Sequence, residues 1–288
     1  WSLRSEVEFT TLRAAGYHDA LHCFDQFVWR RSHAKKAPLP LRRGDDFQPY
    51  FESNVRPVYP NLRVTKAAIR DLTWSGGAIE ILFLDAPKSL PELSSVLAAF
   101  GPSLIPGVSV IVFQDYQHLP SFAVPAVLSC LEDYLEVQHV LESGSTTSFT
   151  VRKPIRFDTA QPVHWNFNRW SREEAAAAWR RILAPLPPRS RARMAGGLAL
   201  ILYESHGKAA ACQALREAER SDELLATWQK FTTFPFYERY RPLFRILGIR
   251  PRPGDRPPFA SLRWKIREVR AGIRPLRRRV RDWARARH

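Results

Sequence analysis

The sequence predicts an α/β fold, with a doubly wound sheet over residues 1–154 and a mainly helical, basic region after it. Over 1–154, short apolar runs rich in β-branched and aromatic residues alternate with helical stretches, which is the pattern of strands joined by crossover helices. From residue 155 onward the apolar residues recur at helical spacing instead. The 288 residues, 45% of them hydrophobic, suffice for one or two domains with their own cores.

Four runs are predicted to form strands, in the order 20–24, 62–65, 79–84 and 108–113. The last two are almost continuously apolar, so we expect central strands that are covered on both faces. Residues 89–100 are predicted to form the crossover helix between them, because a Gly-Pro pair and then an Ile-Pro-Gly turn follow directly.

A helix is expected near 124–134, after the fourth strand. The runs at 135–141 and 148–153, joined by the turn Glu-Ser-Gly-Ser-Thr, predict an antiparallel hairpin that finishes the sheet. Farther along, Ser171 and Glu174 have the spacing of a capping box, so a helix begins there.

The chain is therefore expected to divide into a sheet domain at 1–154, a helical region at 155–250, a proline-rich linker at 251–260 and a basic tail at 261–288. The net charge of +16 lies in the second half, since 1–154 is nearly neutral and the tail has 11 Lys and Arg against 2 Asp and Glu. Such asymmetry predicts anionic partners, namely membrane lipid, nucleic acid or an acidic protein.

The tail repeats apolar residues at alternating spacings of four and three, which forms one stripe on a helix. The stripe consists of Leu262, Ile266, Val269, Ile273, Leu276, Val280 and Trp283. Arginines on the other faces suit a peripheral position on an anionic membrane surface. The alternatives are that the stripe packs on the protein's own body or binds a protein or nucleic-acid partner. Gly272 and Pro275 predict a bend within the tail.

The sequence favours a cytoplasmic location. Its cysteines, Cys23, Cys130 and Cys212, have the spacing of neither a disulfide framework nor a zinc site, which fits a reducing compartment. No signal-peptide pattern follows Trp1. Uncharged apolar stretches reach about half of the roughly 20 residues that a bilayer span requires.

Four segments together carry a resemblance to a known family. They are LHCFDQF at 21–27, the apolar run with Asp-Ala at 79–86, LIPG at 104–107 and VIVFQDYQH at 110–118. In order and spacing they resemble class I S-adenosylmethionine-dependent methyltransferases, closest to the macrocin-type sugar O-methyltransferases. The resemblance covers residues 1–153. It implies a Rossmann-like sheet, S-adenosylmethionine as cofactor, and O-methylation of a small hydroxylated molecule such as a sugar.

One part of the family pattern is missing, because its first strand and glycine-rich turn are not found. Residues 3–15 fit the helix that normally follows that turn. We therefore expect the missing piece upstream of Trp1, in agreement with the absence of an initiator Met.

Three aspartates follow predicted strands, at the carboxyl ends where ligands lie in open α/β sheets. They are Asp25, Asp85 and Asp115. The resemblance implies that Asp25 accepts hydrogen bonds from the ribose hydroxyls of the cofactor and that Ala68 and Ile69 lie against its adenine. It also implies a part for Asp85 in cofactor binding and catalysis. The alternative for Asp25 is a solvated loop or cap residue.

Asp85 and Asp115 could also supply hard oxygen ligands to Mg²⁺, which would lower the pKa of a bound substrate hydroxyl. Metal-dependent members of the family have Asp where this chain has Gln114, whose carbonyl can ligate without adding charge. The alternative is that both aspartates bond to backbone amides. His118, three residues after Asp115, is the candidate general base, and its alternative is a histidine on a surface loop.

Two functions follow from these features. The first is an O-methyltransferase. The second is a catalytically degenerate methyltransferase-like scaffold whose basic helical half binds an anionic membrane surface or a partner, which Gln114, Ala86 and the missing glycines favour. Nucleic acid is disfavoured as a partner, because the basic residues avoid the catalytic half and no Asn-Pro-Pro-Tyr or Pro-Cys target motif is present. The oligomeric state is not predicted.

Overall fold

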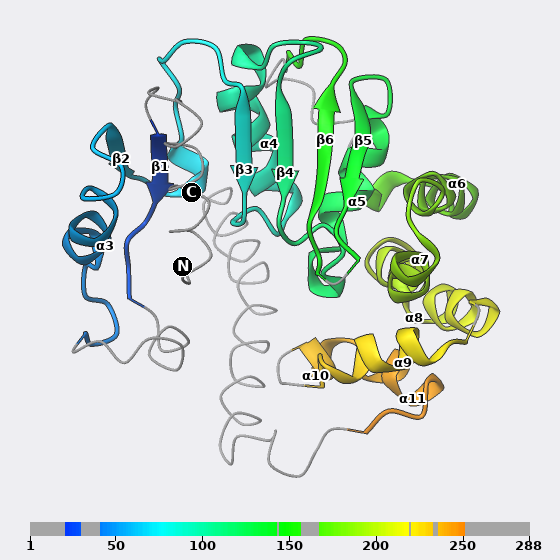
Figure 1. Cartoon of the computed structure of the whole chain (residues 1–288). Helices are drawn as coiled ribbons and strands as arrows, with labels where there is room; N and C mark the ends of the chain where they lie inside the picture. Colours follow the sequence, from blue (N-terminus) through cyan, green and yellow to red (C-terminus); the bar gives the residue numbers. More distant parts are fainter. Residues whose placement is uncertain are drawn as a thin grey trace, which may run out of the picture. The chain divides into compact units, whose positions relative to one another are not determined.

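The computed structural model describes residues 21–29, 41–142, 144–156, 167–218, 220–232 and 236–250. The expected helix at 3–15, the linker at 251–260 and the basic tail at 261–288 lie outside these residues. Within the described residues the chain forms two compact units (Figure 1). The first takes residues up to 79 with 91–105 and 154–156, and the second takes 80–90, 106–153 and 167–250. This division differs from the expected boundary at 154, because one unit contains both the larger sheet and the helical region.

The first unit contains a two-stranded parallel sheet of β1 (Leu21–Asp25) and β2 (Leu62–Lys66), with helix α3 (Gln48–Val55) between them in sequence. These strands confirm the runs expected at 20–24 and 62–65. The core of this part contains Phe27, Phe51, Tyr59 and Leu62. The register pairs Asp25 with Lys66, so the carboxyl ends of the strands lie side by side.

Helix α4 (Leu90–Phe100) confirms the helix expected at 89–100. Its buried residues share one face, at spacings of three, one and three: Leu93, Val96, Leu97 and Phe100. In the first unit the Phe100 ring packs edge-on against Phe24 and tilted against Trp74, with centroid distances of 5.2 and 5.8 Å. The short 3₁₀ helix η2 (Gly101–Ser103) follows directly.

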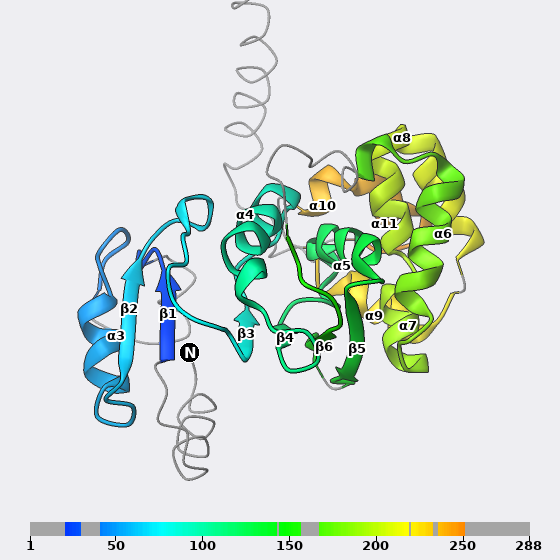
Figure 2. The same ribbon diagram turned by 90° about the horizontal axis from the view of Figure 1, so that it is seen from above.

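The second unit contains a four-stranded sheet in the order β3-β4-β6-β5 (Figure 2). Its strands are β3 (Ile81–Leu84), β4 (Val110–Phe113), β5 (Leu135–Val140) and β6 (Thr147–Val151). Strand β3 is parallel to β4, and β6 is antiparallel to both β4 and β5. The expected hairpin that ends the sheet is confirmed, with an irregularity between Val137 and His139. The chain is thus a mixed α/β protein.

The expectation that both apolar strands are covered on two faces is wrong for β3. Among the described strands, β4 lies between two partners but β3 is at the edge. Leu82 and Leu84 of β3 are buried, whereas Ile81 and Phe83 are 60% and 53% exposed. An apolar run shows that the side chains on both faces of a strand are hydrophobic. Whether each face is buried depends on which other elements pack against that face.

Helix α5 (Ala123–Leu128) is shorter than the helix expected at 124–134 and continues into the 3₁₀ helix η4 (Ser129–Leu131). All six residues of α5 are buried, which agrees with its uniformly apolar sequence. Another 3₁₀ helix, η3 (Leu119–Ser121), precedes it.

The described residues beyond 151 form helices and no strand, as expected. The α-helices are α6 (Arg172–Leu183), α7 (Pro188–Met194), α8 (Gly197–Glu217), α9 (Asp222–Gln229), α10 (Phe236–Arg239) and α11 (Arg241–Ile246). The predicted capping box opens α6, since Glu174 N donates to Ser171 Oγ at 3.1 Å and Ser171 N donates to Glu174 Oε2 at 2.6 Å. No helix within the described ranges has both the length and the apolarity to cross a bilayer.

Replacing Gly197 by alanine should destabilise the protein by about 1–3 kcal/mol, because overpacking a well-filled core costs that much. A Cβ at Gly197 would lie 2.0 Å from Cζ2 of Trp179, whose side chain is only 4% exposed and whose Nε1 donates to Met194 O at 3.2 Å. Chemical denaturation measures the change. Gly77→Ala is the matched control, since no atom beyond its chain neighbours lies within 4 Å of its added Cβ. Equal stability of the two variants would contradict the prediction.

Candidate functional site

The second unit brings Asp85 and Asp115 to one edge of its sheet. Strands β3 and β4 are parallel and in register up to the pair Leu84 and Phe113, and Gln114 N donates to Leu84 O at 3.0 Å. Asp85 directly follows β3, and Asp115 follows β4 after one residue, Gln114. The two aspartates therefore lie at the same edge of the sheet.

A lysine lies between the two aspartates. The ammonium of Lys88 donates to the Asp115 carboxylate and to the Asp85 backbone carbonyl, and its Nζ is 3.5 Å from Asp85 Oδ1. The side chains of Lys88 and Asp85 are 39% and 58% exposed, and that of Asp115 is 23% exposed. The positive group that contacts both aspartates is thus the ammonium of Lys88. The sequence had predicted either a metal ion or backbone amides at this place.

The turn before β6 supports the other side of Asp115. Ser145 Oγ lies 2.8 Å from Gln114 O and 3.3 Å from Asp115 Oδ1, and Thr146 Oγ1 lies 3.3 Å from Gln114 O. The backbone at Gln114 is therefore held by two hydroxyls. From α7, Arg193 donates to Gly144 O at 2.9 Å and so ties the helical region to this turn.

His118 lies in the loop after β4, where it precedes η3. Its backbone N–H donates to Asp115 O at 3.1 Å, and its Nδ1 is 3.3 Å from Ser121 Oγ and 3.9 Å from Asp115 Oδ2. The Phe231 ring, from the helical region, forms a T-shaped contact with the imidazole at a centroid distance of 4.9 Å. His118 is thus a half-buried residue of this loop, with contacts on several sides.

Burial lowers the pKa of His118 below its ordinary value of 6.5, and the Lys88 ammonium lowers it further, while the Asp115 and Asp85 carboxylates oppose this. The imidazole is therefore mainly neutral at pH 7. A neutral imidazole can accept a proton, which is the requirement for a general base.

Asp25, Ala68 and Ile69 belong to the first unit. The exposed Asp25 ends β1, its Oδ1 accepts from Phe27 N at 2.6 Å, and its carbonyl accepts from Ala67 N at 2.9 Å. Ala68 and Ile69, both half-buried, follow at the end of β2, where the 3₁₀ helix η1 (Ile69–Asp71) begins. The parallel pairing of β1 and β2 thus gathers these three predicted residues at one sheet edge.

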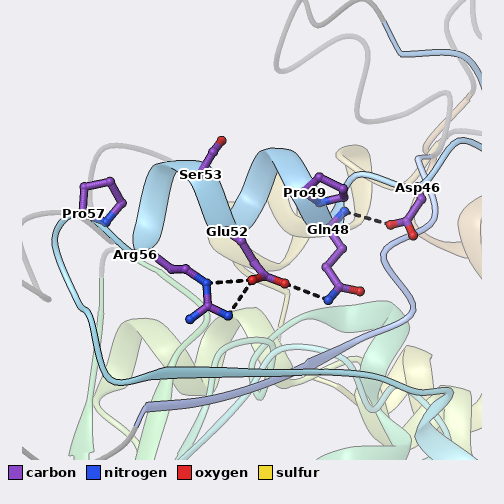
Figure 3. Close-up of a pocket in the computed structure, with 7 residues that line it drawn as sticks. All are labelled: Asp46, Gln48, Pro49, Glu52, Ser53, Arg56 and Pro57. Atoms are coloured by element: carbon purple, nitrogen blue, oxygen red, sulfur yellow. Dashed lines mark hydrogen bonds and ion pairs between the residues drawn. The ribbon is translucent and has the colours of Figure 1, made fainter.

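An open depression of about 700 Å³ lies on α3 in the first unit (Figure 3). It is lined by Asp46, Gln48, Pro49, Glu52, Ser53, Arg56 and Pro57, and by none of the predicted site residues. Its charged side chains are paired, Glu52 with Arg56 and Asp46 with Lys66. Hydrogen bonds from Gln48 and then Arg56 lower the pKa of Glu52, and the bond from Lys66 lowers that of Asp46. This surface therefore offers a paired polar network and no candidate acid or base.

Sequence reasoning missed Lys88, Ser145 and Phe231. The position of Lys88, three residues after Asp85, was a weak indication that its ammonium could reach that carboxylate. Ser145 lies in a turn that was predicted only to connect two strands. Nothing in the sequence indicated Phe231, because its contact with His118 joins residues far apart in the chain.

Among the described residues, no group of three or more His, Cys, Asp or Glu side chains could hold a metal ion. Comparison of the chain with family models, with curated proteins and with solved structures gave no match.

Proposed function

We propose that the chain is an S-adenosylmethionine-dependent O-methyltransferase that acts on a small hydroxylated molecule, for example a sugar. The observation that carries the proposal is the edge of the four-stranded sheet where Asp85, Asp115 and the neutral, half-buried His118 converge. In open α/β sheets, ligands bind outside the carboxyl ends of the strands. The parallel pair closed by an antiparallel hairpin also agrees with the sheet that the resemblance implies.

The first unit has residues that suit the cofactor. One carboxylate oxygen of Asp25 is engaged by Phe27 N, and the side chain is exposed, so its second oxygen would accept a ribose hydroxyl. Ala68 is small enough to allow the backbone close to an adenine ring, and Ile69 would cover that ring with apolar surface. When bound, the cofactor supplies an electrophilic methyl group on a sulfonium.

His118 would act as the base for the substrate hydroxyl. With a hydrogen on Nδ1 donated to Ser121 Oγ, its Nε2 is left to accept the hydroxyl proton. The proton that the substrate hydroxyl loses on methylation would thus pass to Nε2 of His118. Asp85, exposed beyond β3, would accept a hydrogen bond from the bound substrate, and positioning would supply much of the rate.

Calorimetry on the full chain tests the proposal, with S-adenosylmethionine and S-adenosylhomocysteine as ligands and adenosine triphosphate as a control for general nucleotide binding. We expect both sulfur-containing nucleosides to bind and the triphosphate to bind more weakly. No binding of either sulfur-containing nucleoside would contradict the proposal and favour the scaffold function. Binding of the tail to an anionic membrane surface stays a prediction, because 261–288 lies outside the described residues.

A further inference from the structure

The two aspartates at the edge of the larger sheet already share a cation. Lys88 reaches the Asp115 carboxylate and the Asp85 carbonyl at once, and its Nζ is 3.5 Å from Asp85 Oδ1. Asp115 bonds Lys88 through Oδ2, while its Oδ1 lies 3.3 Å from Ser145 Oγ. Both carboxylate oxygens of Asp115 therefore have partners from the protein.

This arrangement does not fit a bound Mg²⁺. Magnesium requires oxygens at about 2.0–2.1 Å in near-octahedral geometry, so it would have to take the place of the ammonium that now meets Asp115. Two carboxylates and one ammonium leave one net negative charge, and Gln114 adds none. Close approach of a divalent ion to the ammonium would also be repulsive, more strongly in a partly buried site than in water.

We propose that the ammonium of Lys88 supplies the positive charge at this edge of the sheet. It takes the role that a divalent ion would have and keeps such ions from binding Asp115. The same ammonium draws the ends of β3 and β4 together and holds the Asp115 carboxylate in position. For catalysis, and here the inference rests on the proposed function, a fixed positive charge would stabilise the negative charge that develops on a substrate hydroxyl. Methyl transfer would then need no added metal.

Binding of Mn²⁺ alone tests the charge assignment, with free Mn²⁺ measured by electron paramagnetic resonance in the full chain. We expect the wild type and Asp115→Asn to bind the same amount, because no ion reaches Asp115 in either. Lys88→Ala should bind additional Mn²⁺, and the double variant Lys88→Ala/Asp115→Asn should lose that addition. Lys88→Arg, which keeps the charge, should behave as the wild type.

Two outcomes would overturn the inference. In the first, the wild type binds more Mn²⁺ than Asp115→Asn, so that a divalent ion reaches this carboxylate beside the lysine. In the second, Lys88→Ala gains no Mn²⁺, so that the lysine is not what excludes the ion. Lys88 is partly exposed, and thermal melting of each variant verifies its folding. No cofactor or substrate enters these measurements, so their result is independent of whether the chain transfers methyl groups.

Discussion

The variant His118→Ala is expected to transfer methyl groups about 100-fold more slowly than the wild type, because a positioned general base contributes at least that factor. The loss should appear in kcat with a smaller change in KM, since the base acts as the proton leaves the hydroxyl. In the wild type, kcat should fall as the pH drops through the pKa of His118, which burial holds below 6.5. The variant should lack this decline. Steady-state rates across pH measure both effects.

Two further variants separate catalysis from structure. His118→Gln retains a side chain that can bond Ser121 but cannot act as a base near neutral pH, so it should be as slow as the alanine variant. His139→Ala removes an exposed histidine of β5 and should leave the rate unchanged. A rate for His118→Ala within threefold of the wild type would show that His118 is a structural residue of the loop.

Asp25→Ala is expected to weaken S-adenosylmethionine binding by about 2–3 kcal/mol, or roughly 30- to 150-fold, through the loss of charge-assisted hydrogen bonds to the ribose. The substitution also removes the bond to Phe27 N. Phe27 has a φ of 51°, which is unfavourable for a bulky residue, and its side chain is only 1% exposed. Calorimetry gives the affinity, and thermal melting shows how much of the change is structural.

Asp25→Asn separates the two roles of this carboxylate. Its Oδ1 can still accept from Phe27 N, which leaves an amide NH₂ where the second carboxylate oxygen was. An NH₂ group cannot accept a hydrogen bond from a ribose hydroxyl, so binding should fall as in the alanine variant while the melting temperature stays near that of the wild type. Wild-type affinity in Asp25→Asn would mean that Asp25 serves the fold of this turn alone.

Local signals in the sequence were sufficient for several elements. Ser171 and Glu174 predicted the start of α6 because a capping box involves only residues three apart. The meeting of Asp85 and Asp115 was also predictable, because parallel strands end at the same edge of a sheet. The alternation of apolar runs and turns predicted the four strands β1 to β4 and the final hairpin, because such alternation is a local property of the chain.

Other features depended on contacts between distant residues. The continuous apolar run at 79–84 predicted a covered strand, yet Ile81 and Phe83 are exposed, because a run of apolar residues carries no information about what packs on each face. Likewise, the charge boundary near 154 did not coincide with the compact units, since contacts and not composition define them.

The sequence by itself determined the mixed α/β class, the order of the strands along the chain and the three aspartates that follow them, because each depends on local propensity and periodicity. Only the tertiary structure decided what surrounds those aspartates. It placed Lys88 between two of them, set Ser145 against Asp115, and brought Phe231 from the helical region onto His118. The position of a charged or aromatic side chain at such an edge is set by packing between elements distant in sequence, and no local pattern encodes that packing.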